Sequence, residues 1–214
     1  MKRVLCVLAI AGLALLAGTA AAQESGLIAK GIKAGLGMYK FSGSDNDIEG
    51  ASPDLKMGVA GGGFLTFALG PNFALQPEVL YVMKGSKYEE DPYKLTFKFS
   101  YLDIPVLLKY RFPTAGTTRP NLFAGPVASF KMSADVEEEG PDGTEETDFS
   151  DAVKGLDFGL ALGGGIDFTA GANLITFDVR YTIGMTDWPD ADDDDDDAPT
   201  IKNSGWLVMA GFSF

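Results

Sequence analysis

The chain has 214 residues, of which 17 are basic and 30 are acidic, so its formal net charge is −13. A hydrophobic content of 46% excludes a disordered chain, and the excess of negative charge argues against a nucleic-acid partner, which needs a basic surface. The absence of histidine excludes Ser-His-Asp hydrolysis, Cys-His catalysis and histidine-ligated metal sites. We therefore expect neither enzymatic activity nor a cofactor.

Residues 1–22 have the pattern of a secretory signal peptide. A short basic start, Met1 to Arg3, precedes an apolar stretch, and Ala20 to Ala22 offer a small-residue cleavage site before Gln23. The alternative is an uncleaved anchor, but the apolar stretch is shorter than the roughly 20 residues that a spanning helix needs. We expect cleavage to remove the only cysteine, Cys6, and to leave residues 23–214 as one domain without disulfides.

The rest of the chain alternates with the period of two that is typical of strands. We predict eight strands, at residues 28–42, 56–69, 73–87, 94–112, 121–134, 155–168, 173–186 and 203–214. Short connections follow every second strand and long connections follow the others. This arrangement predicts an all-β fold, an eight-stranded antiparallel up-and-down transmembrane β-barrel with short periplasmic turns and long acidic extracellular loops.

One parity of these strands is bulky and apolar. The residues that we expect to face lipid include Phe177, Val179, Tyr181, Val208 and Phe212. The opposite parity carries glycine, alanine, serine and a few charges, which suits the narrow interior of an eight-stranded barrel. A soluble sandwich or a secreted lipocalin-like ligand carrier would also alternate, but its outward parity would carry several lysine and glutamate residues in each strand.

The segment 94–112 breaks this phase. Its first half places large side chains on one parity, at Leu95, Phe97, Phe99 and Tyr101. Its second half places them on the other parity, at Ile104, Val106, Leu108, Tyr110 and Phe112. A bulge near Tyr101–Leu102 would reconcile the two halves, and Pro105 supports an irregularity here. Alternatively, residues 94–101 rise above the bilayer, where parity is less constrained.

Charged residues on the inward parity predict an ion-paired lumen. The expected network consists of Glu78, Asp103, Lys109, Arg111, Asp178 and Arg180, with Lys33 and Lys84 on the same parity. Unpaired charges in a narrow lumen are costly. We therefore expect Glu78 and Asp103 to face Lys109, Arg111 or Arg180, and we interpret the network as a plug that fills the barrel rather than as a catalytic cleft.

Most of the acidic residues lie in the four long connections, so one end of the barrel is expected to be strongly anionic. A run of six aspartates provides weak candidates for calcium ligands, namely Asp192, Asp193, Asp194, Asp195, Asp196 and Asp197. The run lacks the spacing of an EF-hand loop, and a solvated, self-repelling tract is the simpler interpretation. Adaptation to high salt would give the same composition.

Aromatic residues near the strand ends are expected to form the two interfacial girdles of a membrane barrel. At one rim we expect Phe67, Phe73, Phe112, Phe168 and Phe214. Toward the other rim we expect Tyr39, Tyr81, Trp188 and Trp206.

Several segments resemble the PorT-type outer-membrane β-barrel family, which consists of small barrels of the Bacteroidetes-type outer membrane. The main resemblance lies in Leu75-Gln76-Pro77-Glu78-Val79-Leu80-Tyr81 with Lys84-Gly85, and in the segment Tyr101 to Tyr110. Weaker matches are Gly31 to Leu36, Phe123 to Pro126 and Asp157 to Gly165. The terminal Phe214 resembles the aromatic C-terminus that the barrel-assembly machinery recognises.

The resemblance implies a non-enzymatic barrel embedded in the cell outer membrane, with outer-membrane lipid as its surroundings and the barrel-assembly machinery as its partner during biogenesis. The namesake branch takes part in protein secretion and gliding, which makes an extracellular or secretion-system protein a further candidate partner. From the residues alone, the first hypothesis is a structural or interaction protein with acidic loops. A narrow cation-selective pore is the second hypothesis, and an outer-membrane enzyme is disfavoured by the missing histidine.

Overall fold

A computed structural model describes residues 26–44, 52–141, 143–171, 173–189 and 199–214. The expected signal peptide lies outside these residues. The strands are β1 (Leu27–Ser42), β2 (Asp54–Ala68), β3 (Phe73–Glu90), β4 (Tyr93–Arg111), β5 (Thr118–Gly140), β6 (Gly143–Asp148), β7 (Leu156–Ala170), β8 (Asn173–Gly184) and β9 (Lys202–Ser213). A short 3₁₀ helix, η1 (Ser150–Ala152), precedes β7. The described residues contain no helix that is long and apolar enough to cross a membrane.

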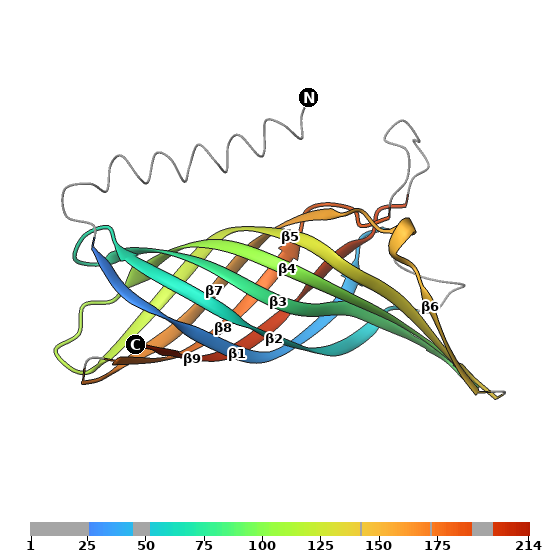
Figure 1. Cartoon of the computed structure of the whole chain (residues 1–214), viewed down its shortest axis with the longest axis horizontal. Coiled ribbons are helices and arrows are strands. Elements are labelled where there is room, and N and C mark those ends of the chain that lie inside the picture. Colours follow the sequence, from blue (N-terminus) through green and yellow to red (C-terminus); the bar gives the residue numbers. More distant parts are fainter. Residues whose placement is uncertain (1–25, 45–51, 142, 172, 190–198) are drawn as a thin grey trace, which may run out of the picture.

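Eight of these strands form a closed antiparallel ring. The order around the sheet is β4-β3-β2-β1-β9-β8-β7-β5, and an additional pairing of β4 with β5 closes it. Figure 1 shows the resulting barrel, with the start of β1 and the chain terminus marked C at the same end, the left one in this view. The pairing of β1 with β9 joins the first and last strands of the ring. The eight-stranded barrel predicted from the alternation is therefore confirmed. The ninth strand, β6, lies outside the ring, and β5 is its one strand partner in the part of the chain that the structure describes.

The connections at the opposite end differ from the prediction in two places. Residues 88–93 were expected to be a loop, but β3 and β4 continue to a tight turn between Glu90 and Tyr93. Residues 135–154 were also expected to be a loop, but β5 continues to Gly140 and turns back into β6. Both segments pack apolar or aromatic side chains against the interior, Tyr88 in the first and the partly buried Val136 in the second, so they gain burial by extending the sheet. Figure 1 shows this extension projecting beyond the barrel.

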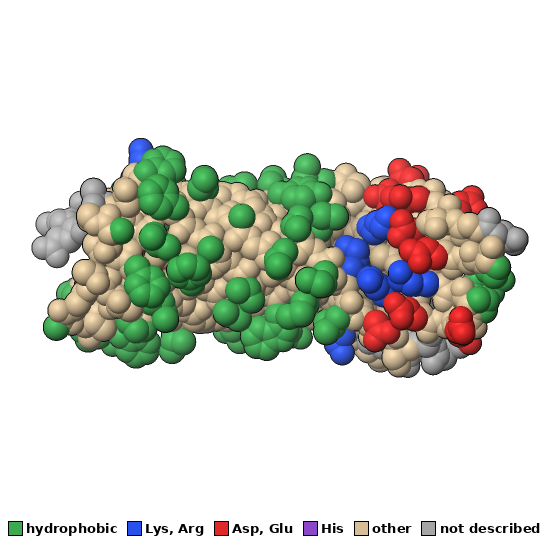
Figure 2. Space-filling model, turned by 90° about the horizontal axis from the view of Figure 1, so that it is seen from below, with side chains coloured by type: hydrophobic (Ala, Val, Ile, Leu, Met, Phe, Trp, Pro, Cys, Tyr) green, Lys and Arg blue, Asp and Glu red, His purple; other side chains and the backbone are tan. Residues whose placement is uncertain are grey.

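The apolar parity faces outward. The strands β8 and β9 expose Phe177, Val179, Val208 and Phe212 by 44–51%, whereas Arg180 between them in sequence is 2% exposed. Figure 2 shows hydrophobic side chains over the left and middle of the visible face, and charged side chains gathered at the right end. An apolar exterior around a polar interior is the inverse of a soluble barrel, so it contradicts the soluble-carrier alternative. We assign the charged end to the extracellular side because short turns lie at the periplasmic side.

The phase break in β4 does not come from a bulge in that strand. Odd-numbered residues from Phe97 to Lys109 are all buried, so β4 keeps one parity throughout. The extra residue belongs to β5, where Ser133 pairs with Ser100 and Lys131 pairs with Tyr101, leaving Met132 between them. The aromatic residues Phe97, Phe99 and Tyr101 therefore point into the barrel, because its extracellular half is filled by large side chains.

The girdle prediction is confirmed for some residues and wrong for two. Exposed aromatic side chains at the periplasmic rim are Phe73, Phe112, Phe168 and Phe214, while Phe67 is half-buried. Tyr81 and Trp206 are exposed toward the other rim, but Tyr39 and Trp188 are 3% and 6% exposed. Tyr39 shares the inward parity of β1. Trp188 turns inward beside the bridge between Val153 and Pro189.

Two adjacent glycines of β2 show how closely neighbouring backbones approach inside the ring. A Cβ atom added to Gly62, on the bore side, would overlap the carbonyl oxygen of Val79 and lie 2.9 Å from the Cα of Leu80. A Cβ atom added to Gly61, on the lipid side, would have its nearest neighbour 3.7 Å away, at the carbonyl oxygen of Lys33. The bore side therefore requires glycine at this point, because backbone atoms cannot move aside as a flexible side chain does.

We expect Gly62→Ala to lower the free energy of unfolding by about 1–3 kcal/mol, since the added methyl group would push two paired backbones apart. The matched substitution Gly61→Ala should change it by no more than about 0.5 kcal/mol, as surface substitutions usually do. Urea unfolding in lipid vesicles, followed by tryptophan fluorescence, measures both. Equal effects of the two substitutions would contradict the close approach.

Candidate functional site

Four charged side chains meet in the middle of the bore and form an ion-pair tetrad. Lys33 of β1 donates to Glu78 of β3 and to Asp178 of β8, with both Nζ–O distances at 2.8 Å. Arg180 of β8 lies 2.7 Å from Glu78 and 2.9 Å from Asp178. All four residues are no more than 7% exposed. Two positive and two negative groups thus neutralise one another, as burial requires.

Aromatic rings complete the surroundings of the tetrad. The Arg180 guanidinium carbon lies 5.3 Å from the ring centroid of Phe123, and Lys33 Nζ lies 5.1 Å from that of Phe64. Cations at this distance are attracted by the ring faces. The tetrad therefore fills the bore with groups whose charges and donors are satisfied, and it holds strands β1, β3 and β8 together across the barrel.

A second polar layer lies on the periplasmic side of the tetrad. Lys109 lies 3.5 Å from Asp167 and donates to the Gln76 side-chain oxygen at 3.1 Å. Gln76 in turn donates to Glu78 at 2.6 Å, which connects the two layers. Asp167 was not among the residues that the sequence suggested, because it lies near the end of β7. The signal in the sequence that could have identified Asp167 is its position on the inward-facing parity of its strand.

Asp103 and Arg111 do not take the places expected for them. Asp103 pairs with Lys84 at 3.0 Å, and not with Lys109, Arg111 or Arg180. Arg111 is half-buried at the last position of β4, opposite Asn121, and its Nε has no hydrogen-bond partner among the described residues. The reason is reach: Lys84 lies four residues beyond Leu80, the residue opposite Asp103, and its long side chain extends to that carboxylate, whereas Arg111 is the last residue of β4 at the periplasmic rim.

An aromatic plug closes the extracellular half of the bore. It is formed by Phe41, Tyr88, Phe97, Phe99 and Trp188. The Phe41 ring centroid lies 5.0 Å from that of Trp188 and 5.3 Å from that of Phe97, and Phe99 lies 5.2 Å from Trp188. Offset and edge contacts at such distances add to the burial of large rings. The sequence indicated Phe97 and Phe99 only as part of a break in alternation, and it predicted a girdle position for Trp188.

The other predicted site residues divide between the wall and the part of the chain that is not described. Tyr181 is half-buried on the outer wall, with its ring centroid 5.0 Å from that of Trp206. Phe214 is 63% exposed, and its backbone N–H donates to Lys30 at 2.9 Å. Its role as an assembly signal stays a prediction. The aspartates 192–197 lie outside the described residues, within which no cluster of three or more His, Cys, Asp or Glu could hold a metal ion.

The extracellular extension is formed by the ends of β3, β4 and β5 together with β6. Three cross-strand ion pairs join it: Lys94–Glu139 at 3.2 Å, Lys98–Glu137 at 2.5 Å and Lys98–Glu146 at 3.5 Å. The hydrogen bond to Glu137 raises the pKa of the Lys98 ammonium above its ordinary value. Asp148 accepts the backbone N–H of Ser150 at 2.8 Å, which lowers the pKa of its carboxyl group. These hydrogen bonds therefore favour the charged forms of Lys98 and Asp148.

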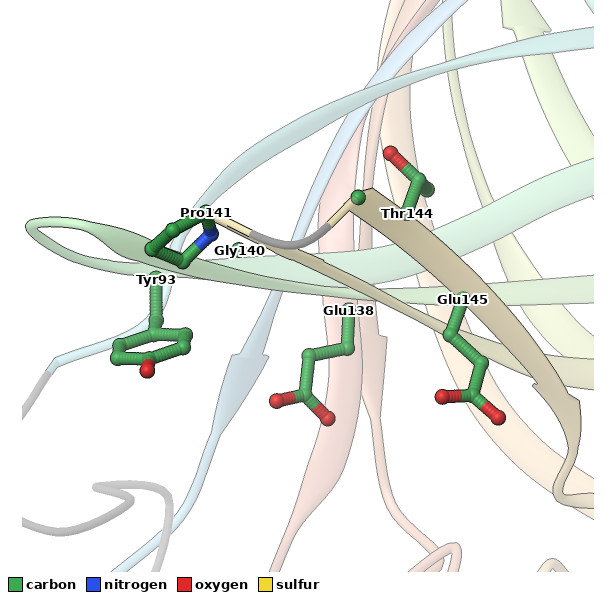
Figure 3. A pocket seen from close by; sticks show the side chains of 7 residues that line it. Tyr93, Glu138, Gly140, Pro141, Thr144 and Glu145 are labelled. Atoms are coloured by element: carbon green, nitrogen blue, oxygen red, sulfur yellow. The ribbon is translucent and has the colours of Figure 1, made fainter.

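A hollow of about 430 Å³ lies at the tip of the extension. Its lining consists of Tyr93, Glu138, Gly140, Pro141, Gly143, Thr144 and Glu145. Glu138 and Glu145 are direct cross-strand partners, and Figure 3 shows their carboxylates and the Tyr93 ring pointing the same way. No ion pair to either carboxylate is found within the described ranges. Like charges placed directly opposite each other are unfavourable, so this hollow favours a cationic group.

The sequence of residues 21–188 matches the family described as outer membrane protein beta-barrel domain. No curated protein gives a significant sequence match. Neisserial surface protein A is 14% identical, and the alignment covers 86% of this chain and 97% of that chain with a TM-score of 0.47. OprG from Pseudomonas aeruginosa is 16% identical, with 87% and 95% covered and a TM-score of 0.49.

Ail of Yersinia pestis is 12% identical, with 88% of this chain and 100% of that chain covered and a TM-score of 0.42. The family match covers well over half of the sequence, and the ring of eight strands has an apolar exterior and a charged interior. The chain therefore belongs to the outer membrane protein beta-barrel domain family, as a small barrel of the outer membrane.

Proposed function

We propose that the protein is a closed, non-enzymatic barrel whose extracellular extension binds a basic, extended segment of another protein. The filled bore supports a closed barrel, because the tetrad and the aromatic plug occupy it at different levels. Eight-stranded barrels are just wide enough for side chains to fill them. This packing argues against the narrow cation-selective pore. The lack of histidine supports a role without catalysis.

The hollow at the tip of the extension is the observation that carries the binding role. A lysine or arginine side chain placed there would lie between the Glu138 and Glu145 carboxylates and beside the Tyr93 ring. It would relieve the repulsion between the two acids and gain a contact with the ring. Tyr93 is 56% exposed, so its ring is available to a partner.

The strand β6 supports an extended partner. Gly143 to Asp148 are all exposed, and among the described residues β6 pairs with a strand on one side only, that of β5. A free edge offers backbone donors and acceptors to an added strand, and pockets beside the edge provide the selectivity. The acids of β6 would favour a basic strand over a neutral or acidic one.

The resemblance to the PorT-type family supports a protein partner, because the namesake branch of that family takes part in protein secretion. The two segments that carry the resemblance pair directly, with Leu75 opposite Leu108 and Tyr81 opposite Leu102. They form the wall that continues into the extension. A secretion-system protein with a basic segment therefore fits the proposal as one kind of partner.

Binding of a defined peptide tests the proposal. We expect a fluorescent peptide of alternating lysine and threonine to bind the refolded barrel, measured by anisotropy, and its glutamate–threonine counterpart not to bind. The double substitution Glu138→Gln with Glu145→Gln should weaken binding about tenfold, which is ~1.4 kcal/mol. Tyr93→Leu should also weaken it, because the contact with the ring face is lost.

The matched control removes the same charge elsewhere on the extension. Glu89 and Glu90 are exposed at the end of β3 and do not line the hollow. Glu89→Gln with Glu90→Gln should leave the affinity within about twofold if the hollow holds the lysine. If both double substitutions weaken binding equally, attraction by bulk charge explains it and the proposed site is wrong.

A further inference from the structure

One buried carboxylate in the bore has no ion-pair partner. Asp157 of β7 is 3% exposed. The other buried acids of the described residues, Glu78, Asp103, Asp167 and Asp178, each lie within 3.5 Å of a lysine or arginine nitrogen. Asp157 instead accepts a hydrogen bond of 3.4 Å from the Asn203 amide at its Oδ2. An uncompensated carboxylate in such a place is costly and calls for a positive charge.

Oxygen atoms from four strands converge around Asp157. The register places Asp103 of β4 beside Ser129 of β5, and Ser129 beside Asp157 of β7, so the three lie in one row across the wall. Asn203 reaches the row from β9. Three oxygens here have no hydrogen-bond partner within the described part of the chain: Asp157 Oδ1, Asn203 Oδ1 and the Tyr101 hydroxyl. Each of them can accept.

The charges of this layer do not balance. The ammonium group of the layer is that of Lys84. Its Nζ lies 3.0 Å from Asp103 Oδ1 and donates to Ser129 Oγ at 2.9 Å. Lys131 is engaged elsewhere, because its Nζ donates to the carbonyl oxygens of Ser150 and Val153. Lys56 is also buried, but its Nζ donates to the carbonyl oxygen of Lys84 at 3.1 Å and not to a carboxylate. Asp103 and Asp157 therefore have one ammonium between them, that of Lys84, which leaves one negative charge of this layer without an ion-pair partner.

We propose that this layer binds one monovalent hard cation, with Na⁺ as the natural occupant, at Asp157 Oδ1, Asn203 Oδ1 and the Tyr101 hydroxyl. Carboxylate, amide and hydroxyl oxygens are ligands that suit hard cations. A single positive charge restores neutrality, whereas a divalent ion would leave an excess. A cation can satisfy several acceptors at once, whereas a proton on Asp157 can satisfy only one. The ion would thereby join β4, β7 and β9 below the aromatic plug.

The test is a sodium titration of unfolding with the mature protein in phosphatidylcholine vesicles. NaCl replaces choline chloride at constant ionic strength, so that general screening stays the same and only the small cation changes. One bound Na⁺ predicts that the unfolding equilibrium constant falls tenfold for each tenfold rise in Na⁺ above the dissociation constant, and levels off below it. The wild-type curve alone can overturn the site, whatever the variants do.

Asp157→Asn removes the charge while keeping the shape, and it should abolish the sodium dependence. The control Asp151→Asn removes an exposed acid of η1 and should leave the dependence intact. A wild-type curve that is flat in Na⁺ overturns the proposal, as does one that depends only on pH, which would show that a proton shared among Asp157, Asp103, Lys84 and Tyr101 balances the layer. An unchanged sodium response in Asp157→Asn would also overturn it.

Discussion

Arg180→Leu is expected to lower the free energy of unfolding of the barrel by about 3–5 kcal/mol, the usual effect of removing one partner of a buried ion pair. Glu78 and Asp178 would then share Lys33 as the only remaining base of the tetrad. One buried negative charge would be left without compensation. Urea unfolding in lipid vesicles measures the loss, and heat-modifiable gel mobility shows whether the variant still closes.

Charge balance, rather than loss of volume, is the expected cause, and a second substitution separates the two. Adding Asp178→Asn to Arg180→Leu leaves one base and one acid, Lys33 and Glu78, at 2.8 Å. The double variant should therefore recover a large part of the lost stability. A double variant that is less stable than Arg180→Leu alone would contradict the tetrad as a balanced unit.

The same protein preparations test, by conductance measurements, whether the bore is closed. In planar bilayers the wild-type protein should give no steady current, because the tetrad and the aromatic plug fill the bore at different levels. Arg180→Leu should give at most brief openings, since the aromatic plug remains. A persistent cation-selective current through the wild-type protein would instead support the pore.

Val179→Arg is expected to lower the free energy of unfolding by about 2–4 kcal/mol, the cost of an arginine on the lipid face near the middle of the bilayer. Val179 is 45% exposed on the outer wall and lies between Gly164 and Val208 on the neighbouring strands. The measurement is again unfolding in lipid vesicles. Unchanged folding in lipid would mean that this parity does not face hydrocarbon.

A substitution at a different depth in the bilayer provides the control for this prediction. Ile175 is 38% exposed on the same face of β8, but it pairs with Phe168 and Phe212 near the periplasmic rim. Ile175→Arg should therefore lower the free energy of unfolding by only about 0–1 kcal/mol, because a cation near the interface reaches the headgroups. Val179→Leu, which keeps the apolar character, should have little effect. Equal losses at positions 175 and 179 would point to packing rather than to lipid.

The two large losses of stability, from Arg180→Leu and from Val179→Arg, are expected at neighbouring residues of β8 that point to opposite faces of the barrel wall. Val179 is exposed on the outer wall, while Arg180, one residue later, is buried as a member of the tetrad. The alternation of a strand makes this possible, because successive side chains point to opposite faces. The barrel is thus stabilised by an apolar wall outside and by balanced charges inside, which leaves the extension free to carry a binding site.

The sequence by itself determined the eight strands of the ring and, for most of them, the direction of their faces. A period of two is a property of a single strand, so Val179 and Phe177 could be assigned to lipid without knowing any neighbour. The inward parity of Glu78, Asp178 and Arg180 followed in the same way. These assignments needed no long-range information, since an apolar exterior is imposed on each strand separately by the surrounding hydrocarbon.

Only the tertiary structure decided which inward groups meet. Lys33 donates to Glu78 and Asp178, which are separated from it by 45 and 145 positions in the sequence. Asp103 forms its ion pair with Lys84 and not with any of the bases that were expected. Such pairs depend on the stagger of all the strands around the closed ring, which no single strand encodes. The same holds for Trp188, which packs on Phe41 inside the barrel, and for Glu138 and Glu145, which a strand extension brought face to face where a loop was expected.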